Sequence, residues 1–375
     1  MHISSNFDSG NIEIVSAEDP QDIRLRIRPD VGEDAFFQWF HFRVSGVAGE
    51  SLVIRIENAG EASYPAGWDG YRACVSGDRD SWVRTDTDYQ DGVLTIRHLA
   101  EVDSLYFAYF APYSRERHRD LIAACQTQPN CRHAVLGETL DGEELDLLVI
   151  GDGDPAKKSV WAIARQHPGE SMAEWCMEGF LTRLLDRSDP VGREILARAN
   201  VYAIPNMNPD GSRRGHLRTN AAGINLNREW DKASMEKSPE VLLALKAMDN
   251  AGLHFCLDMH GDEGLPYNFI AGADAVPSAT QKMIDLRVAY EAALQRANPD
   301  FQTKHGYPKA APGKANLSMC SAQLAERFGA LSMTLEMPFK DNADAPDPVN
   351  GWSIARSRLM GAAQLDAIYA VIDDL

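Results

Sequence analysis

The segment Val160-Trp-Ala-Ile-Ala-Arg-Gln-His-Pro-Gly-Glu-Ser171 decides the fold class, because it reads as a buried strand, a turn and the start of a helix. Five apolar residues in succession are typical of a strand that is covered on both faces, as in a parallel sheet. Pro168 and Gly169 then indicate a tight turn. An apolar periodicity from Ser171 to Leu185 predicts the helix that follows. This succession indicates an α/β domain.

Similar units occur on both sides of this segment. Short apolar runs predict strands at residues 147–151, 201–205, 254–258 and 331–336. Periodic stretches predict helices at residues 239–251, 278–297 and 352–372. We therefore expect residues 113–375 to form an α/β domain with a mixed, mainly parallel sheet flanked by helices.

Residues 1–112 have a different pattern. The run Ile23-Arg-Leu-Arg-Ile-Arg28 alternates cleanly, and residues 36–44, 51–56, 93–99 and 105–110 are rich in aromatic and branched side chains. Strands in succession, without helical patterns between them, predict an all-β antiparallel sandwich. Trp39 and His41 read as ordinary strand residues, and Pro112 to Arg119 as the linker between the two domains.

Composition restricts the class of protein. A chain of 375 residues suits two domains, and its formal net charge of -18 argues against nucleic acid and anionic membranes as partners. No apolar run reaches membrane-spanning length, and the first ten residues lack the pattern of a secretory signal, so we expect a cytoplasmic location. The six cysteines form no C-x-x-C pair, and we expect free thiols, including Cys125 and Cys131.

Three residues are candidates for a metal site. His167 and Glu170 have the spacing of a two-ligand zinc half-site, and His260 in Asp258-Met-His-Gly would complete it. A His/Glu/His set is typical of catalytic zinc, which keeps a fourth position open. Both histidines follow the ends of predicted strands, which fits a ligand site and also fits ordinary turn residues. Asp258 either orients His260 or forms a salt bridge elsewhere.

The segment between these candidates is basic in an acidic chain. Arg213, Arg214, Arg218 and Arg228 lie within residues 205–230. They would provide a local pocket for a substrate carboxylate or a developing oxyanion, or they form a solvated loop.

Five motifs occur in one order along the chain. They are His-Pro-Gly-Glu-Ser at 167–171, Asn-Pro-Asp-Gly at 208–211, Gly-Ile-Asn-Leu-Asn-Arg at 223–228, Asp-Met-His-Gly at 258–261 and Thr-Leu-Glu-Met-Pro at 334–338. In these motifs the chain resembles the zinc carboxypeptidases. Within that family it resembles the bacterial type of the cytosolic carboxypeptidase-like branch, which carries an N-terminal β-sandwich.

The resemblance implies a role for each matching residue. One Zn²⁺ per chain would be bound by His167, Glu170 and His260. Glu336 would be the general base, and Arg218 would polarise the scissile carbonyl. The terminal carboxylate of the substrate would be held by two further residues, Asn227 and Arg228.

The function implied is a zinc metallocarboxypeptidase. Zinc-activated water would hydrolyse the C-terminal peptide bond of peptides or protein tails. An alternative is a zinc amidohydrolase acting on N-acyl amino acids or peptidoglycan-derived peptides, since the same groups suit any amide next to a free carboxylate. A zinc-binding recognition protein, with the sandwich docking a partner, is the non-enzymatic alternative.

Two positions depart from the family pattern. Asn225 stands where many members have an aspartate that supports the first zinc histidine. Tyr307 is only a candidate for the mobile tyrosine that many secreted members place over the substrate. In the same loop, Lys314 would either favour an acidic terminal residue or remain solvated.

Overall fold

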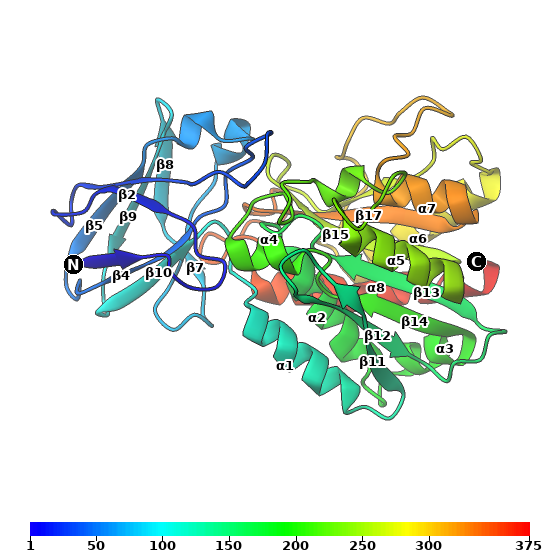
Figure 1. Ribbon diagram of the computed structural model, residues 1–375. Helices are drawn as coiled ribbons and strands as arrows, with labels where there is room; N and C mark the ends of the chain where they lie inside the picture. Colours follow the sequence, from blue (N-terminus) through cyan, green and yellow to red (C-terminus); the bar gives the residue numbers. More distant parts are fainter.

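The computed structural model describes residues 1–375. In its N-terminal domain, two five-stranded sheets pack face to face (Figure 1). The first sheet has the order β1 (His2–Ser4), β4 (His41–Ser45), β10 (Ser104–Ala108), β6 (Cys74–Ser76), β7 (Val83–Arg84). The second has the order β2 (Glu13–Ser16), β3 (Ile23–Arg26), β5 (Ser51–Ile56), β9 (Val93–Leu99), β8 (Asp86–Gln90). Alternate residues of the strands enter one shared core, such as Ile23 and Leu25 of β3, so the predicted sandwich is confirmed.

One pair of strands departs from the antiparallel pattern. β5 and β9 are antiparallel, with Ile54 opposite Ile96, but β3 and β5 run parallel. Between β3 and β5 the chain crosses to the other sheet, where it forms β4. A crossover of this kind lets the chain return in its original direction, as parallel pairing requires.

A seven-stranded mixed sheet organises the rest of the chain. Its order is β11 (Cys131–Glu138), β12 (Glu144–Ile150), β14 (Ala199–Ile204), β13 (Lys158–Ala164), β15 (Phe255–Asp262), β17 (Leu331–Pro338), β16 (Phe269–Gly272). The four strands from β14 to β17 in this order are parallel to one another, and antiparallel strands complete both edges. The predicted mixed, mainly parallel sheet is confirmed.

Helices cover both faces of this sheet. One hydrophobic cluster contains the buried side chains of α2 (Ser171–Leu184), α6 (Gln281–Ala297) and α8 (Ile354–Tyr369). A second cluster contains buried side chains of α5 (Pro239–Ala251) and α7 (Cys320–Phe328), which lie over the other face of the sheet. Other helical segments are α3 (Pro190–Arg198), α4 (Pro209–Arg214) and the short turns η1 (Ala59–Glu61), η2 (Pro65–Trp68), η3 (Leu226–Arg228) and η4 (Ile372–Asp374).

Helix α1 (Arg115–Gln126) begins inside the segment predicted as a linker, and this prediction was wrong there. The Ser114 side chain accepts a hydrogen bond from the backbone N–H of Arg117 and caps the helix. The first half of α1 is strongly charged, and the buried residues of the helix are confined to Leu121, Ile122 and Cys125. Such a narrow apolar stripe gives a weak helical signal.

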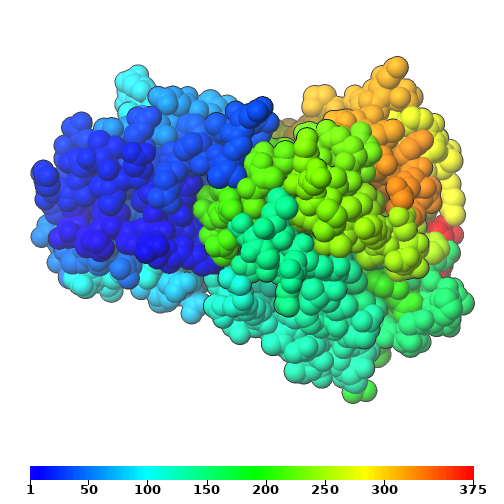
Figure 2. All heavy atoms as spheres, viewed as in Figure 1, coloured from blue at the N-terminus to red at the C-terminus, as the bar shows by residue number.

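The two domains share one interior. A cluster of 74 buried residues extends through both, and the Tyr109 ring stacks on Phe339 with centroids 4.4 Å apart. Buried Arg84 donates to the carbonyl oxygens of Phe339 and Trp352 at 2.6 and 3.1 Å. Figure 2 shows the blue surface of the N-terminal domain meeting the green surface formed by residues near 200–220.

The six cysteines are free and buried. No helix is both long and apolar enough to cross a membrane.

Candidate active site

The three metal-ligand candidates lie together and are buried. His167 and Glu170 lie in the loop between β13 and α2, and His260 lies on β15. One donor atom of each lies within 4.8 Å of the other two. Glu170 Oε1 is 2.6 Å from His167 Nδ1, and its Oε2 is 2.7 Å from His260 Nδ1.

The chemistry of this donor set fits zinc. Two imidazoles and one carboxylate are typical ligands of a catalytic zinc ion, and donors on a tetrahedral ion with bonds of about 2.1 Å lie about 3.4 Å apart. The Nδ1 atoms of His167 and His260 are 3.2 Å apart, so at most one of them carries a proton in this contact. Burial and nearby Arg218 lower the pKa of His167 to about 4, which leaves its imidazole neutral, as a ligand must be.

Two polar side chains orient the histidines from outside. Asp258 Oδ2 lies 3.0 Å from His260 Nε2, so Asp258 contacts His260 rather than forming a salt bridge elsewhere. Asn225 Oδ1 lies 3.0 Å from His167 Nε2, where its carbonyl oxygen can accept a hydrogen bond. These contacts fix both ring orientations, with a carboxylate behind one imidazole and an amide behind the other.

A buried ionic network holds the loop that carries His167. Arg165 has a φ of 60°, and its side chain donates to the carbonyl oxygens of Pro168 and Tyr113, both at 2.9 Å. It also pairs with Glu174 at 2.7 Å, and both side chains are almost fully buried. Non-glycine residues rarely adopt a positive φ, so these bonds offset the cost of a turn that the loop requires.

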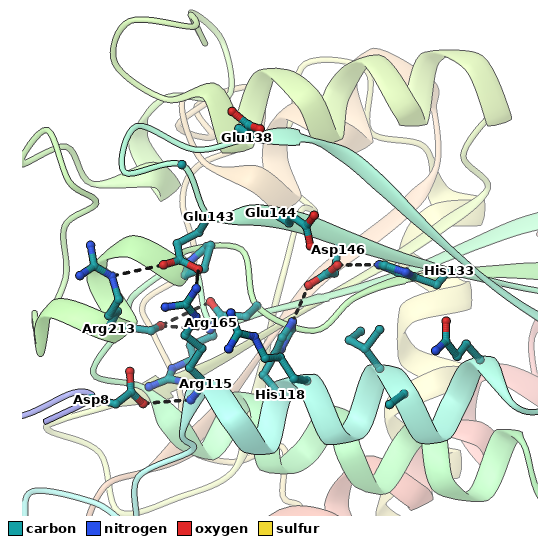
Figure 3. Close-up of a pocket in the computed structure, with 18 residues that line it drawn as sticks. Asp8, Arg115, His118, His133, Glu138, Glu143, Glu144, Asp146, Arg165 and Arg213 are labelled. Atoms are coloured by element: carbon teal, nitrogen blue, oxygen red, sulfur yellow. Dashed lines mark hydrogen bonds and ion pairs between the residues drawn. The ribbon is translucent and has the colours of Figure 1, made fainter.

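The network continues outward from Glu174 to α1. His118 lies 2.7 Å from Glu174 and 2.9 Å from Asp146, and Asp146 also contacts His133 at 2.6 Å. Burial opposes charge on His118, but the two carboxylates raise its pKa to about 9. Figure 3 shows His118 and His133 pointing at Asp146 beside a pocket that Arg165 also lines.

Glu336 faces the ligand cluster from the next strand. It is opposite His260 in the pairing of β15 with β17. Glu336 lines a cavity of about 580 Å³ together with His167, Glu170 and Arg218. The side chain is 7% exposed, and its Oε2 atom has no hydrogen-bond partner within the protein. Burial raises its pKa well above the ordinary value. Glu336 therefore lines the cavity beside the ligand cluster with one buried carboxyl oxygen that no protein group satisfies.

The cavity wall opposite the sheet belongs to the N-terminal domain. Residues 64–67 line it, and the backbone of Gly67 packs against Glu263. The Arg218 guanidinium lies 5.8 Å from the Phe36 ring and 5.5 Å from the Tyr64 ring. Sequence reasoning found no site residues in this domain.

The other expected substrate residues lie beside this cavity rather than in its wall. Asn227 accepts a hydrogen bond from the backbone N–H of Cys320 at 2.8 Å, and Arg228 donates to the carbonyl oxygen of Asn227 at 2.6 Å. Burial and the neighbouring charge of Arg218 lower the pKa of Arg228. Arg218 and Arg228 therefore form a local positive region in an acidic protein.

Two arginines of the basic segment lie elsewhere. Arg213 and Arg214 pair with Asp141, both at 2.7 Å, on the turn between β11 and β12. The prediction that all four arginines form one pocket is therefore wrong.

The loop after residue 305 contributes Tyr307 to the cavity. The Tyr307 hydroxyl donates a hydrogen bond to the Asp262 carboxylate at 2.5 Å. Lys314 is exposed and does not line the cavity, which matches the solvated alternative.

Several site residues had little sequence signal. Glu174 interrupts an apolar helical stretch, and Arg165 follows an apolar strand. A charged residue at a position that the pattern predicts to be buried was the only sequence feature that pointed to either of them. Asp262 and Glu263 follow His260 after one glycine and line the cavity. Tyr64 and Phe36 had no signal, because their relation to Arg218 arises only in the folded chain.

A buried His/Glu/His cluster facing an unpartnered carboxylate, at the carboxyl ends of parallel strands, is the arrangement of a metal-dependent hydrolase on an α/β fold. Residues 119–341 match the family model described as zinc carboxypeptidase. Residues 3–110 match the model described as cytosolic carboxypeptidase N-terminal domain. The chain belongs to the zinc carboxypeptidase family, which confirms the expected enzyme class, a zinc metallocarboxypeptidase.

Solved structures of bacterial relatives are similar over their whole length. The metallo-carboxypeptidase of Burkholderia cenocepacia is 47% identical, with a TM-score of 0.97 and full coverage of both chains. The metallo-carboxypeptidase of Pseudomonas aeruginosa, in complex with (2-guanidinoethylmercapto)succinic acid, is 41% identical, with a TM-score of 0.97 and the same coverage. Mouse cytosolic carboxypeptidase 3 is 26% identical over 76% of this chain, which spans only 31% of that protein.

Proposed function

We propose that the protein removes C-terminal residues from peptides or protein tails, with one Zn²⁺ per chain bound by His167, Glu170 and His260. The observation that carries the proposal is the convergence of these three buried groups opposite the free carboxylate oxygen of Glu336. When bound, zinc lowers the pKa of a water molecule towards about 7 and polarises a carbonyl group.

Two side chains would perform the chemistry beside the metal. Glu336 Oε2 takes a proton from the attacking water and later delivers it to the leaving amine. Arg218 donates to the oxygen on which negative charge develops, and its burial against two aromatic rings strengthens that interaction. Both groups line the same cavity as the metal ligands.

The substrate would be held by its free carboxylate and its last side chain. Asn227 and Arg228 would bind the carboxylate. A second cavity of about 450 Å³ shares Glu336 and Tyr307 with the first and includes Thr334 and Ser321, so it would receive the terminal side chain. The complex of the Pseudomonas relative supports a carboxylate site, because its ligand is a succinic acid derivative.

We also propose a boundary between the two domains and a cellular location. The domains divide between residues 112 and 113, a boundary supported by β10 ending at Ala108 and α1 beginning at Arg115. The protein acts in the cytoplasm, which is supported by the match to the cytosolic carboxypeptidase N-terminal domain.

A peptide library with varied C-termini tests the proposed function. Zinc-loaded wild type, Glu336→Gln and a chelator-treated sample would be incubated with the library and read by mass spectrometry. Stepwise loss of terminal residues only in the active wild type is expected. Release of an acyl group or cleavage within the chain, without terminal loss, would contradict a carboxypeptidase and favour an amidohydrolase.

A further inference from the structure

A loop of the N-terminal domain grips the backbone that carries Arg218. The Asp30 carboxylate accepts hydrogen bonds from three consecutive backbone N–H groups. These belong to Leu217 at 2.7 Å, Arg218 at 2.8 Å and Thr219 at 3.0 Å. The Thr219 hydroxyl adds a fourth bond at 3.2 Å. Hydrogen bonds to an ionised carboxylate are stronger than neutral ones, so they fix this segment firmly.

The Asp30 side chain makes its hydrogen bonds with this segment alone. It is 4% exposed, and the bonds from residues 217–219 are its side-chain hydrogen bonds. A buried carboxylate costs free energy unless its oxygens are satisfied, so these contacts explain how it is tolerated there. The interaction joins residues that are 187 to 189 positions apart in the sequence.

The same loop also holds the Arg218 side chain. The backbone N–H of Asp30 donates to the carbonyl oxygen of Phe36 at 2.7 Å, which closes the loop of residues 30–36. The Phe36 ring then lies 5.8 Å from the Arg218 guanidinium, and Tyr64 of the same domain lies 5.5 Å from it. Aromatic faces attract a guanidinium at this range. The loop therefore fixes both the main chain and the charged end of Arg218.

A tight backbone contact keeps the loop in register with the neighbouring segment. Gly32 and Gly223 have φ values of 111° and 76° and pack against each other. A Cβ added at Gly223 would lie 2.5 Å from the Val31 carbonyl oxygen. Gly223 begins the motif that contains Asn227 and Arg228, so loop 30–36 contacts the segment that carries Arg218 and the one that carries Arg228.

From these contacts we infer that Asp30 is a positioning residue for Arg218, so that the N-terminal domain completes the site for the developing negative charge. This inference rests on the function proposed above for Arg218. Asp30 touches no reacting atom, and its effect passes through its hydrogen bonds to residues 217–219. It should therefore affect the transition state more than substrate binding, because Arg218 acts on charge that appears only during the reaction.

Hydrogen exchange and kinetics of Asp30→Asn and Asp30→Ala test this inference. Amides 217–219 should exchange faster in both variants than in the wild type. The kcat should fall by about 10- to 100-fold, the size expected when a catalytic group is misplaced by about 1 Å, while KM changes little. Asp30→Asn should be the milder variant, because the amide oxygen still accepts a hydrogen bond. The matched control is Asp78→Asn, because Asp78 also accepts backbone N–H groups, but within its own loop.

Combination with Arg218→Ala separates positioning from a general effect on folding. If Asp30 acts through Arg218, Asp30→Ala should cause no further loss of kcat in the Arg218→Ala background. An equal fold-loss in both backgrounds would overturn the inference, and so would an unchanged kcat in Asp30→Ala beside a large loss in Arg218→Ala. An unchanged kcat in Arg218→Ala itself would instead refute the role proposed for Arg218.

Discussion

Raising the pH should weaken the fold through His118, which is buried between Glu174 and Asp146. Burial alone would lower the pKa of this imidazole, but the two carboxylates raise it from 6.5 to about 9. The folded state holds the proton more tightly than the unfolded chain does, so the stabilisation is complete below pH 6.5 and is lost as the pH rises through 9. At about 1.36 kcal/mol for each pKa unit, the contribution is about 3 kcal/mol.

Urea unfolding of the wild type and of His118→Gln, followed by tryptophan fluorescence at a fixed zinc concentration, measures this contribution. Glutamine takes up no proton, so the wild type should lose about 3 kcal/mol more unfolding free energy than the variant across this pH range. His2→Gln, which removes an exposed histidine, is the control. Equal losses in the wild type and His118→Gln would refute the reasoning.

Three other changes test the metal centre and the packing. His260→Ala should lower bound zinc, measured by plasma mass spectrometry, well below about one per chain, because catalytic zinc typically needs three protein ligands; an unchanged content would contradict the ligand assignment. Glu336→Gln should keep its zinc and lose at least about 100-fold in kcat, and loss of the metal as well would point to a different role. Gly361→Ala would place a Cβ 1.8 Å from the Cys176 carbonyl oxygen and force α2 and α8 apart. We expect a cost of about 1–3 kcal/mol, and an unchanged thermal midpoint would count against this.

The elements with regular patterns could be predicted closely from the sequence. The strands at 51–56 and 93–99 and the helix at 239–251 match the observed bounds. The pattern was weaker where few side chains are buried. Helix α1 was missed because its charged first half hides three buried residues, and β16 because it is a short edge strand.

The site was only partly predictable for a different reason. His167, Glu170 and His260 lie at the ends of recognisable strands, so their convergence follows from the order of a parallel sheet. The pairing of Arg213 and Arg214 with Asp141 depends on how the β11–β12 turn folds back over α4. The contact of Asp30 with residues 217–219 joins two domains. No local sequence pattern predicts a contact between residues so far apart in the chain.

The hydrophobic cluster that extends through both domains should make them unfold together. A chain cut near residue 112 would expose the Phe339 ring, which now stacks on Tyr109, and the carbonyl oxygens that Arg84 satisfies. Calorimetry of the whole chain should then record a single cooperative transition rather than two. In evolutionary terms, a sandwich joined in this way cannot be exchanged as an independent module, and insertions would be tolerated only in loops away from this shared interior.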